Sequence, residues 1–381
     1  MNKKKIVFFL KEYGFAEKYF SNIFSKLENK YLIKILHTST LENSNILDSK
    51  YYNQDISFWP FSKLKKIILE EKIEYIALTN IRSLLDINII ALANDLNVSV
   101  VYIEHGMTLD KIIVFKRSNL FHSFKKYIIY CSNTIINIII SNNKNVIVKN
   151  IYKAFLKADY SNLRLNKAML YSSYSFKVLN KIFDLSKTKI IYSGYPIAET
   201  INEINKLNKC KVKKQVLFIH QPLILDKFSD ISINEEISIL NEMCNKVISY
   251  GYDFILKLHP RSDFKLYKKL FKGKISDTKI SIENLISESS IIIGYFSTAL
   301  LMALKLNKTL LIFNQKGINT EEINVFKTDN NYFESVDELE MLLTSLDNDV
   351  LKINQISFMD ISGEINTHSD RYKKLLSLLD I

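Results

Sequence analysis

Glycine and proline are scarce in this sequence, which has 8 Gly and 4 Pro among 381 residues. Average proteins carry about 12% of the two together, so we expect each one to lie where the backbone requires it. Cysteine is equally rare, with three residues and no CxxC pair. This argues against a disulfide scaffold and a cysteine-based zinc site, and it favours a reducing compartment.

Long apolar segments are also missing, because no stretch reaches the ~18–20 apolar residues of a transmembrane helix. Residues 3–10 resemble a signal peptide only superficially, since the apolar run stops at Lys11 and a β-strand explains it better. The aromatic and apolar stretch 121–140 is either a buried helix–strand pair or a contact with a membrane surface. We expect a cytoplasmic protein, with peripheral contact at the inner membrane face left open.

Positive charge is plentiful, but arginine is not. The formal net charge of +12 rests on 47 Lys and only 5 Arg, and Arg is the better residue for phosphate forks and base edges. This disfavours a nucleic-acid partner and indicates a Lys-rich, solvated surface, with some charge left for an anionic substrate or membrane. The arginines that stand out against the lysines are Arg82, Arg117, Arg164, Arg261 and Arg371.

Short apolar strands alternate with longer helices in the first half of the chain. Such alternation is typical of a parallel α/β sheet. The pattern predicts strands over 5–10, 31–37, 74–79, 98–103 and 189–193, helices over 15–29, 61–73, 82–96 and 165–184, and a strand-rich segment over 127–150.

The same alternation restarts after a polar, Lys-rich segment at 206–214, which we expect to link two domains. We therefore predict an α/β protein with two Rossmann-like domains whose parallel sheets face a central cleft. The first covers 1–204 and the second 205–381, and the last helix, near 367–380, could fold back onto the first domain. Strands are expected at 215–220, 253–258, 290–293 and 309–313, and helices at 233–250, 281–289, 297–306 and 335–345.

The scarce Gly and Pro residues coincide with the ends of predicted strands. In open parallel sheets, ligands bind outside the carboxyl ends of the strands, and Pro fixes a turn there while Gly allows close backbone approach. We expect these strand ends to form the ligand site. They are Glu104-His105-Gly106, Gly194-Tyr195-Pro196, His220-Gln221-Pro222, His259-Pro260-Arg261 and Gly294-Tyr295-Phe296-Ser297-Thr298.

The segment from Gly294 opens a helix that Ser297 or Thr298 can cap. Free N–H groups and the helix dipole attract phosphate at such an end, although ordinary capping of a βα turn is the alternative. His259 can donate a hydrogen bond to a phosphate oxygen, Pro260 stiffens its loop, and Arg261 either adds charge or pairs with Asp263.

Two neighbouring side chains, Glu104 and His105, are each able to take a proton from an attacking hydroxyl. A structural Glu–Lys pair is the alternative for Glu104. His220 and Gln221 are weaker candidates, as a base or as ribose contacts.

Several common motifs are absent: GxGxxG, Walker A, GxSxG and HExxH. Asp347-Asn348-Asp349 forms a DxD triplet, but no strand precedes it, so local turn chemistry explains it better than a metal site. A transferase without a metal must stabilise its leaving group with a helix dipole, His and cations, and the sequence supplies all three.

At these residues the chain resembles a family. YIEHG, LKLHPRSD and IIIGYFSTALLMAL are similar, in order and placement, to the acidic-Gly, His-Pro and Ser/Thr motifs of bacterial sialyltransferases. The lipooligosaccharide sialyltransferases and polysialyltransferases, which have the GT-B fold, look most similar. FIHQPL also looks like the opening strand of their donor domain.

The resemblance implies an inverting, metal-independent glycosyltransferase with CMP-sialic acid as donor and a cell-surface glycan or glycolipid as acceptor. It makes Glu104 the general base. His259 and Pro260 would contact the CMP phosphate, and Ser297 and Thr298 would hold that phosphate or the sugar carboxylate. The first domain would bind the acceptor and the second the donor, with Gly106, His220, Gln221, Pro222, Arg261 and Gly294 as further donor contacts.

One departure from the family pattern keeps a second reading open. The family has two acidic residues before the Gly, and here the second is His105. A His-Gly followed by Gly-Tyr-Pro and His-Pro also resembles the teichoic-acid polyol-phosphate transferases, in which two His would be catalytic and the donor a CDP-polyol. A non-catalytic sugar or nucleotide binding module is the third possibility.

Overall fold

The computed structural model divides into two compact units, and each is described here by itself. Unit 1 comprises Met1–Pro196 with Asn366–Ile381, and unit 2 comprises Ile197–Ile365. Within them the structure describes residues 3–11, 13, 20, 23–41, 51–81, 83–105, 124–157, 159–196, 201–225, 228–315, 326–327, 330–347 and 365–379.

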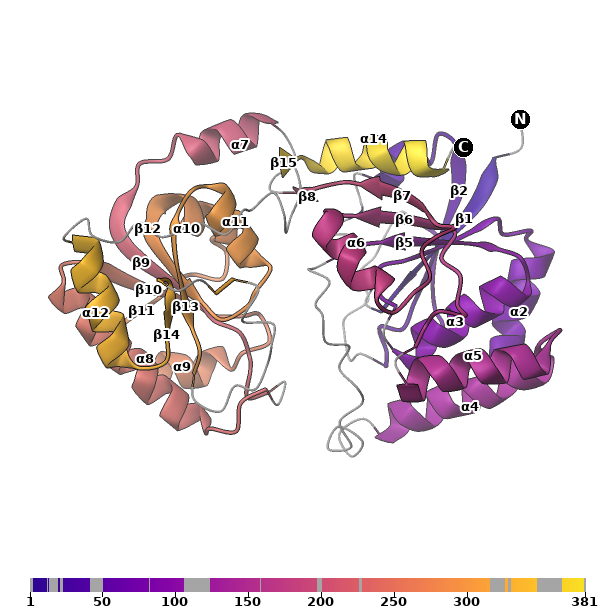
Figure 1. Ribbon diagram of the computed structural model, residues 1–381, viewed down its shortest axis with the longest axis horizontal. Coiled ribbons are helices and arrows are strands. Elements are labelled where there is room, and N and C mark those ends of the chain that lie inside the picture. The colour runs from indigo at the N-terminus through magenta and orange to yellow at the C-terminus, as the bar shows by residue number, and fades with distance from the viewer. Residues whose placement is uncertain are drawn as a thin grey trace. The chain divides into compact units, whose positions relative to one another are not determined.

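Unit 1 is built on a sheet of seven strands in the order β3-β2-β1-β4-β5-β6-β7, and every neighbouring pair is parallel (Figure 1). The order reverses between β1 and β4, as in a doubly wound α/β domain. The strands are β1 (Lys4–Leu10), β2 (Tyr31–His37), β3 (Asn53–Asp55), β4 (Tyr75–Leu78), β5 (Ser99–Ile103), β6 (Lys167–Leu170) and β7 (Lys189–Tyr192).

Helices cover both faces of this sheet because its strands alternate their side chains between two cores. In β1, Val7 and Phe9 join one hydrophobic cluster, and Ile6, Phe8 and Leu10 join the other. The first cluster contains residues of α2 (Phe61–Glu70), α3 (Leu84–Asp95), α4 (Phe124–Ile140) and α5 (Lys144–Lys157). The second contains residues of the segment 20–27 and of α14 (His368–Leu379).

The expectation of a strand-rich segment over 127–150 is wrong, because this stretch forms α4 and α5. Its many Ile and Val residues favour strands as isolated residues, but packing decides the outcome. Asn88 of α3 donates to Thr134 Oγ1 of α4 over 2.8 Å, and Asn137 donates to the Asn88 carbonyl over 3.0 Å. These contacts fix α4 as a helix against α3.

The expectation of one helix over 165–184 is also wrong. The segment splits into strand β6 and helix α6 (Ser173–Asn180). All four residues of β6 are buried between β5 and β7. A short apolar run that is buried on both faces has no alternation to mark it as a strand, so periodicity could not separate it from the helix.

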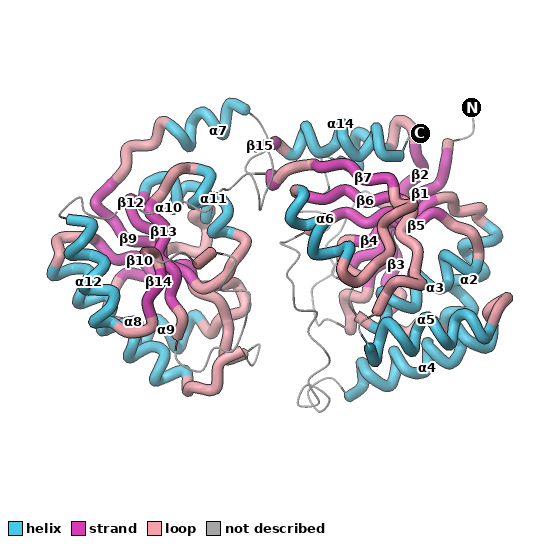
Figure 2. Tube along the Cα trace, in the orientation of Figure 1, coloured by secondary structure: helices cyan, strands magenta, loops and turns pink. Residues whose placement is uncertain are grey.

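Unit 2 has its own parallel sheet of six strands, in the order β11-β10-β9-β12-β13-β14, with the reversal between β9 and β12. Figure 2 shows helices and strands alternating along it. The strands are β9 (Lys213–Ile219), β10 (Asp253–Lys257), β11 (Lys274–Ile275), β12 (Ser289–Gly294), β13 (Thr309–Phe313) and β14 (Tyr332–Phe333); the helices are α7 (Ile201–Asn208), α8 (Ile233–Ser249), α9 (Phe264–Leu270), α10 (Ile282–Glu288), α11 (Ala299–Lys305) and α12 (Val336–Asp347).

The segment expected to link the domains, 206–214, is largely regular structure. It contains the end of α7 and the start of β9, and the boundary expected between residues 204 and 205 falls inside α7. The compact units separate instead at Pro196 and again at Ile365. Close to these points β8 (Tyr195–Pro196) pairs with β15 (Ile365–Asn366).

The C-terminal helix α14 belongs to unit 1, as Figure 1 shows for the helix beside β7. Leu375, Leu378 and Leu379 are fully buried in the second cluster, and the Tyr75 hydroxyl donates to the Leu379 carbonyl over 3.2 Å. The last helix therefore completes the core that the first strands begin. None of the described helices is both long and apolar enough to cross a membrane.

Candidate active site

Glu104 lies directly after β5, at the carboxyl edge of the unit 1 sheet, and is fully buried. Its Oε2 accepts a 2.5 Å hydrogen bond from the Tyr171 amide. Its own amide donates to the Met169 carbonyl over 2.9 Å. A carboxylate held by a backbone N–H at a strand end has a fixed direction, as proton transfer to a defined partner requires.

The residues beside Glu104 come from the next two strand ends. Tyr171, which follows β6, accepts a 3.0 Å hydrogen bond at its carbonyl from the Gly194 amide. Gly194 has φ +65°, a left-handed conformation that glycine adopts without strain, so this scarce glycine is placed where the turn needs it. The Tyr195 ring meets the Tyr171 ring edge-on with centroids 5.4 Å apart.

Arg371 of α14 completes this cluster. The buried guanidinium donates from Nη2 to the Glu104 carbonyl over 3.0 Å and lies 5.4 Å from the centre of the Tyr171 ring. It fastens the backbone of Glu104 from a helix 267 residues away in the chain. The rarity of arginine was the sequence signal that could have found it. His105 is half-buried next to Glu104, and Gly106 lies outside the described residues.

A second polar cluster at the same edge was missed by the sequence analysis. His37 ends β2 and is fully buried, and this burial lowers the pKa of the imidazole even though Asp55 acts to raise it. Ser39 accepts at Oγ from the Tyr13 amide over 2.8 Å, and Asp55, which ends β3, accepts from the Thr40 hydroxyl over 2.7 Å. Residues 37–40 read His-Thr-Ser-Thr at the end of a predicted strand. They therefore belong among the strand ends that were expected to form the ligand site.

In unit 2, His220 follows β9 and is buried, with both ring nitrogens engaged. Nδ1 lies 3.1 Å from Ser262 Oγ, and Nε2 lies 3.3 Å from Glu236 Oε2 and 3.0 Å from Tyr267 Oη. The pattern fits an imidazole that donates from Nε2 to the carboxylate and accepts at Nδ1 from the serine hydroxyl. Such a His220 positions other residues, and its nitrogens are not available as the base or ribose contact expected from the sequence.

Glu236 of α8 is the centre of this buried network and was also missed. The Tyr267 hydroxyl donates to its Oε2, and the Tyr295 hydroxyl lies 3.5 Å from its Oε1 and 3.1 Å from Gln315 Oε1. Burial, and after it the charge of Glu236, raise the pKa of both phenols well above the usual value, so both keep their protons and act as donors. Glu236 shares the buried side of α8 with Leu240, Met243 and Val247. An acidic residue on the apolar face of a helix was the sequence signal that could have identified it.

Replacing Tyr267 by Phe should lower the free energy of unfolding by about 1–3 kcal/mol, because Glu236 and His220 lose a buried partner. Denaturant unfolding of the whole chain measures this. Tyr250→Phe is the matched control, because its hydroxyl bonds Thr344 at an accessible site and its loss should change stability little. Equal stability of the two variants would contradict a stabilising role for the buried hydrogen bonds around His220.

The His259 loop follows β10 and is tied to that network. The Ser262 amide donates to the His259 carbonyl over 2.9 Å, and Ser262 Oγ contacts His220. The Arg261 amide donates to His259 Nδ1 over 3.2 Å. An accepting Nδ1 requires the tautomer with its proton on Nε2, so His259 has the form that can donate to an anion. Pro260 and Arg261 are exposed.

The expected alternative partner of Arg261 has another role. Asp263 accepts at Oδ1 from the Leu266 amide over 3.1 Å and so caps α9.

The segment that opens α11 meets the end of β9. The Phe296 amide donates to Gln221 Oε1 over 3.1 Å, which joins the two strand ends where the order of the sheet reverses. Gly294 closes β12, and a Cβ there would lie 2.7 Å from Leu300 Cδ2, so this glycine lets α11 pack against the strand. Pro222 is buried beside Gln221.

Of the two residues expected to cap α11, only Ser297 accepts a hydrogen bond from the helix. Its Oγ accepts from the Ala299 amide over 3.2 Å, whereas Thr298 already has a helical backbone and makes no side-chain cap. Because α11 is only seven residues long, its macrodipole is small. Any anion at this end would depend mainly on the hydroxyls of Ser297 and Thr298.

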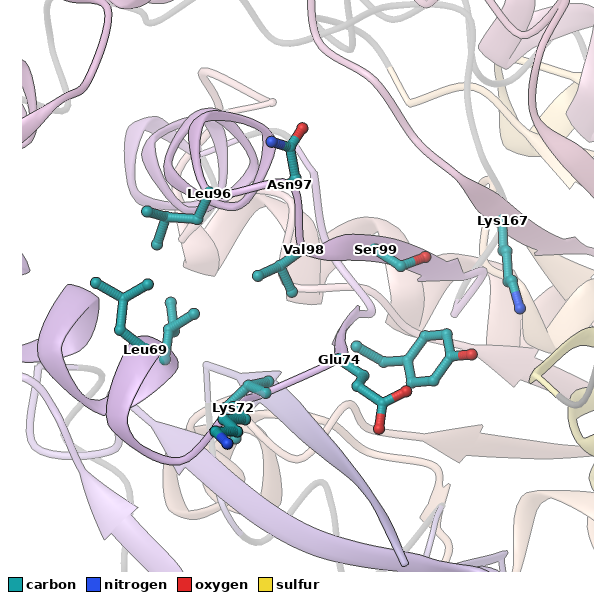
Figure 3. Close-up of a pocket in the computed structure, with 11 residues that line it drawn as sticks. Leu69, Lys72, Glu74, Leu96, Asn97, Val98, Ser99 and Lys167 are labelled. Atoms are coloured by element: carbon teal, nitrogen blue, oxygen red, sulfur yellow. The ribbon is translucent and has the colours of Figure 1, made fainter.

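A hollow of about 500 Å³ lies at the other edge of the unit 1 sheet, where β4, β5 and β6 begin. Figure 3 shows Lys72, Glu74, Ser99 and Lys167 among the residues that line it. Because Glu104 follows the carboxyl end of β5, this hollow belongs to the opposite side of the same strands and is separate from the candidate active site.

Comparison with known proteins identifies the family of the chain and the class of its fold. The sequence model of the alpha-2,8-polysialyltransferase family matches residues 3–314, and no curated protein matches the chain. Among solved structures, a variant of the wall teichoic acid polymerase TagF has a TM-score of 0.56 at 13% identity, covering 100% of this chain and 90% of that one.

S. aureus MnaA in complex with UDP has a TM-score of 0.54 at 11% identity, with 99% and 98% covered. The glycotransferase of kitacinnamycin has a TM-score of 0.51 at 8% identity, with 91% of each chain covered. At these identities the likeness concerns the fold alone, which is the pair of Rossmann-like α/β domains of GT-B glycosyltransferases.

Proposed function

Since the chain belongs to the alpha-2,8-polysialyltransferase family and is a glycosyltransferase, we propose that it moves sialic acid from CMP-sialic acid to a hydroxyl of a cell-surface glycan. The observation that carries the proposal is the family match over residues 3–314, which includes Glu104, His259 and Ser297. Each of these follows a parallel strand at the carboxyl edge of its sheet, where α/β proteins bind ligands.

Unit 1 supplies the base in this proposal. The acceptor hydroxyl gives its proton to Glu104, which the Tyr171 amide and Arg371 hold in place, and the oxygen then attacks the anomeric carbon with inversion. His105 is the other candidate for the same proton. The polar residues at the ends of β2 and β3 lie on the same edge, three to four strand spacings or roughly 14–19 Å from β5, a span suited to an extended glycan acceptor.

Unit 2 receives the leaving group. As CMP departs, negative charge grows on its phosphate, and a donor aimed at that charge lowers the barrier. His259 donates from Nε2, Ser297 and Thr298 contribute hydroxyls, and Arg261 adds positive charge. This set of groups stabilises the phosphate without a metal ion, so metal independence is part of the proposal.

One observation favours a second candidate. His105 stands where the family pattern has a second acid, and a catalytic pair of His105 and His259 would suit transfer of a polyol phosphate from a CDP-polyol. This candidate shares the fold, the cytidine nucleotide and an anionic product with the first.

Donor turnover separates the candidates. The protein is incubated with CMP-sialic acid and a glycan acceptor that ends in galactose or sialic acid, with EDTA present, and CMP release is followed. We expect release that depends on the acceptor. Turnover of CDP-glycerol in place of CMP-sialic acid would support the second candidate, and tight nucleotide binding without turnover would indicate a binding module.

The place of action in this proposal is the cytoplasmic side of a membrane, where the acceptor is assembled, with the enzyme in peripheral contact.

A further inference from the structure

Helix α4 is apolar on its outer side as well as on its packed side. Its packed side carries Tyr130 and Ile136, which join the first hydrophobic cluster, together with buried Asn137, which donates to the Asn88 carbonyl on α3 over 3.0 Å. Its outer side carries Ile128, Ile135 and Ile139, which are 47%, 59% and 61% exposed. The spacings of seven and four residues place the three isoleucines in one stripe. A surface helix in water normally carries charged and polar residues on its outer side.

Helix α5 extends this apolar surface. The two helices contact one another and both pack on α3, and Figure 1 shows them as the outermost layer of their face of unit 1. Val148 and Tyr152 of α5 are exposed at 44% and 52%, and their spacing of four residues places them on one side of the helix. We call the five exposed side chains the α4–α5 surface: Ile128, Ile135, Ile139, Val148 and Tyr152.

All the charged residues of these two helices are lysines. Residues 124–157 contain no Asp or Glu and six Lys, which gives +6 for 34 residues of a chain whose total is +12. Lys144, Lys149 and Lys157 are exposed, and Lys153 pairs with Asp159 outside the helices. The lysines are Lys125, Lys126, Lys144, Lys149, Lys153 and Lys157.

We propose that the α4–α5 surface docks the enzyme on an anionic lipid bilayer. Exposed Ile and Tyr side chains enter the boundary between head groups and acyl chains, and lysines beside them contact the anionic head groups. This goes beyond the proposed peripheral contact by assigning the surface and the lipid charge. Because α4 and α5 cover a face of the sheet, docking leaves the carboxyl edge with Glu104 uncovered.

The positive charge of the surface favours an anionic bilayer over a second copy of the chain as its partner. In a two-fold dimer the same patch meets itself, so the exposed Lys144, Lys149 and Lys157 of one copy would face those of the other and repel. An anionic bilayer offers the opposite charge together with an apolar interior. A bilayer therefore matches both the positive charge and the exposed apolar side chains of the surface.

Vesicle flotation of the full chain tests the proposal. Vesicles of phosphatidylcholine with about one third phosphatidylglycerol are compared with phosphatidylcholine alone. We expect binding to the anionic vesicles only, and at least a tenfold weaker partition for the double variant Ile135→Ser, Ile139→Ser. Ile248→Ser is the matched control, since Ile248 is 55% exposed on α8 in unit 2, and its partition should equal that of the wild type.

Circular dichroism establishes that the variants are folded, and Lys144→Gln with Lys149→Gln should weaken binding without touching the apolar stripe. Equal partition of wild type and double variant, or no binding to anionic vesicles, would overturn the proposal. A concentration-dependent dimer that the double variant abolishes would assign the surface to a second copy instead. CMP release with a soluble acceptor is measured in parallel, so a failure of docking is distinguished from a failure of the proposed reaction.

Discussion

Glu104→Gln is expected to lower the rate of sialic acid transfer about 10²–10⁴-fold, the contribution of a well-placed general base. The amide of Gln has nearly the shape of the carboxylate, and its oxygen can still accept from the Tyr171 amide, so the surroundings of residue 104 are retained. What is lost is a group able to take the acceptor proton. The effect should appear in kcat, with a smaller change in the KM for the acceptor.

The companion variant His105→Ala decides between the two candidate bases. If Glu104 is the base, His105→Ala keeps most of the activity and Glu104→Gln does not. Glu70→Gln is the matched control, because Glu70 is exposed on α2 and pairs with Lys66 on the same helix. Wild-type rates for Glu104→Gln together with a severe loss for His105→Ala would transfer the role to His105.

His259→Ala is expected to cost about 10²–10³ in kcat, the range seen when one donor to a developing anion is removed. The Arg261 amide holds Nδ1 as an acceptor, so the proton lies on Nε2, and Ala removes that donor. The loss should appear in kcat more than in the KM for the donor, because charge on the phosphate grows as CMP leaves.

His259→Gln tests the same role with a different donor. A side-chain amide can supply an N–H to phosphate, so it should recover part of the rate that Ala loses. Ser262→Ala separates positioning from catalysis. It removes the contact between Ser262 Oγ and His220 but keeps the His259 side chain itself. Near-normal turnover by His259→Ala would exclude His259 from leaving-group stabilisation.

The strand ends of the fold could be predicted because they are marked by residues that this chain uses rarely. Gly194 occupies a left-handed position that favours glycine, and a Cβ at Gly294 would meet the Leu300 side chain. The alternating apolar pattern also gave most strands and helices to within a few residues. The two Rossmann-like halves follow from local sequence alone.

The rest depended on contacts between distant parts of the chain. The stretch 124–157 has the Ile and Val content of strands, and only its packing on α3 makes it helical. The network around Glu236 joins α8, the end of β9, α9 and the end of β12, so no window of sequence contains it. Arg371 reaches Glu104 from the last helix, and arginine scarcity hinted at its importance without naming its partner.

The return of α14 to unit 1 has a consequence for synthesis of the chain. Residues up to Pro196 leave the ribosome long before Leu375, Leu378 and Leu379 exist, so the part of their sheet that α14 covers stays exposed while unit 2 is made. Unit 2 is continuous in sequence and can fold as it emerges. Unit 1 is therefore completed only after unit 2 has been translated, and Glu104 receives Arg371 at that point.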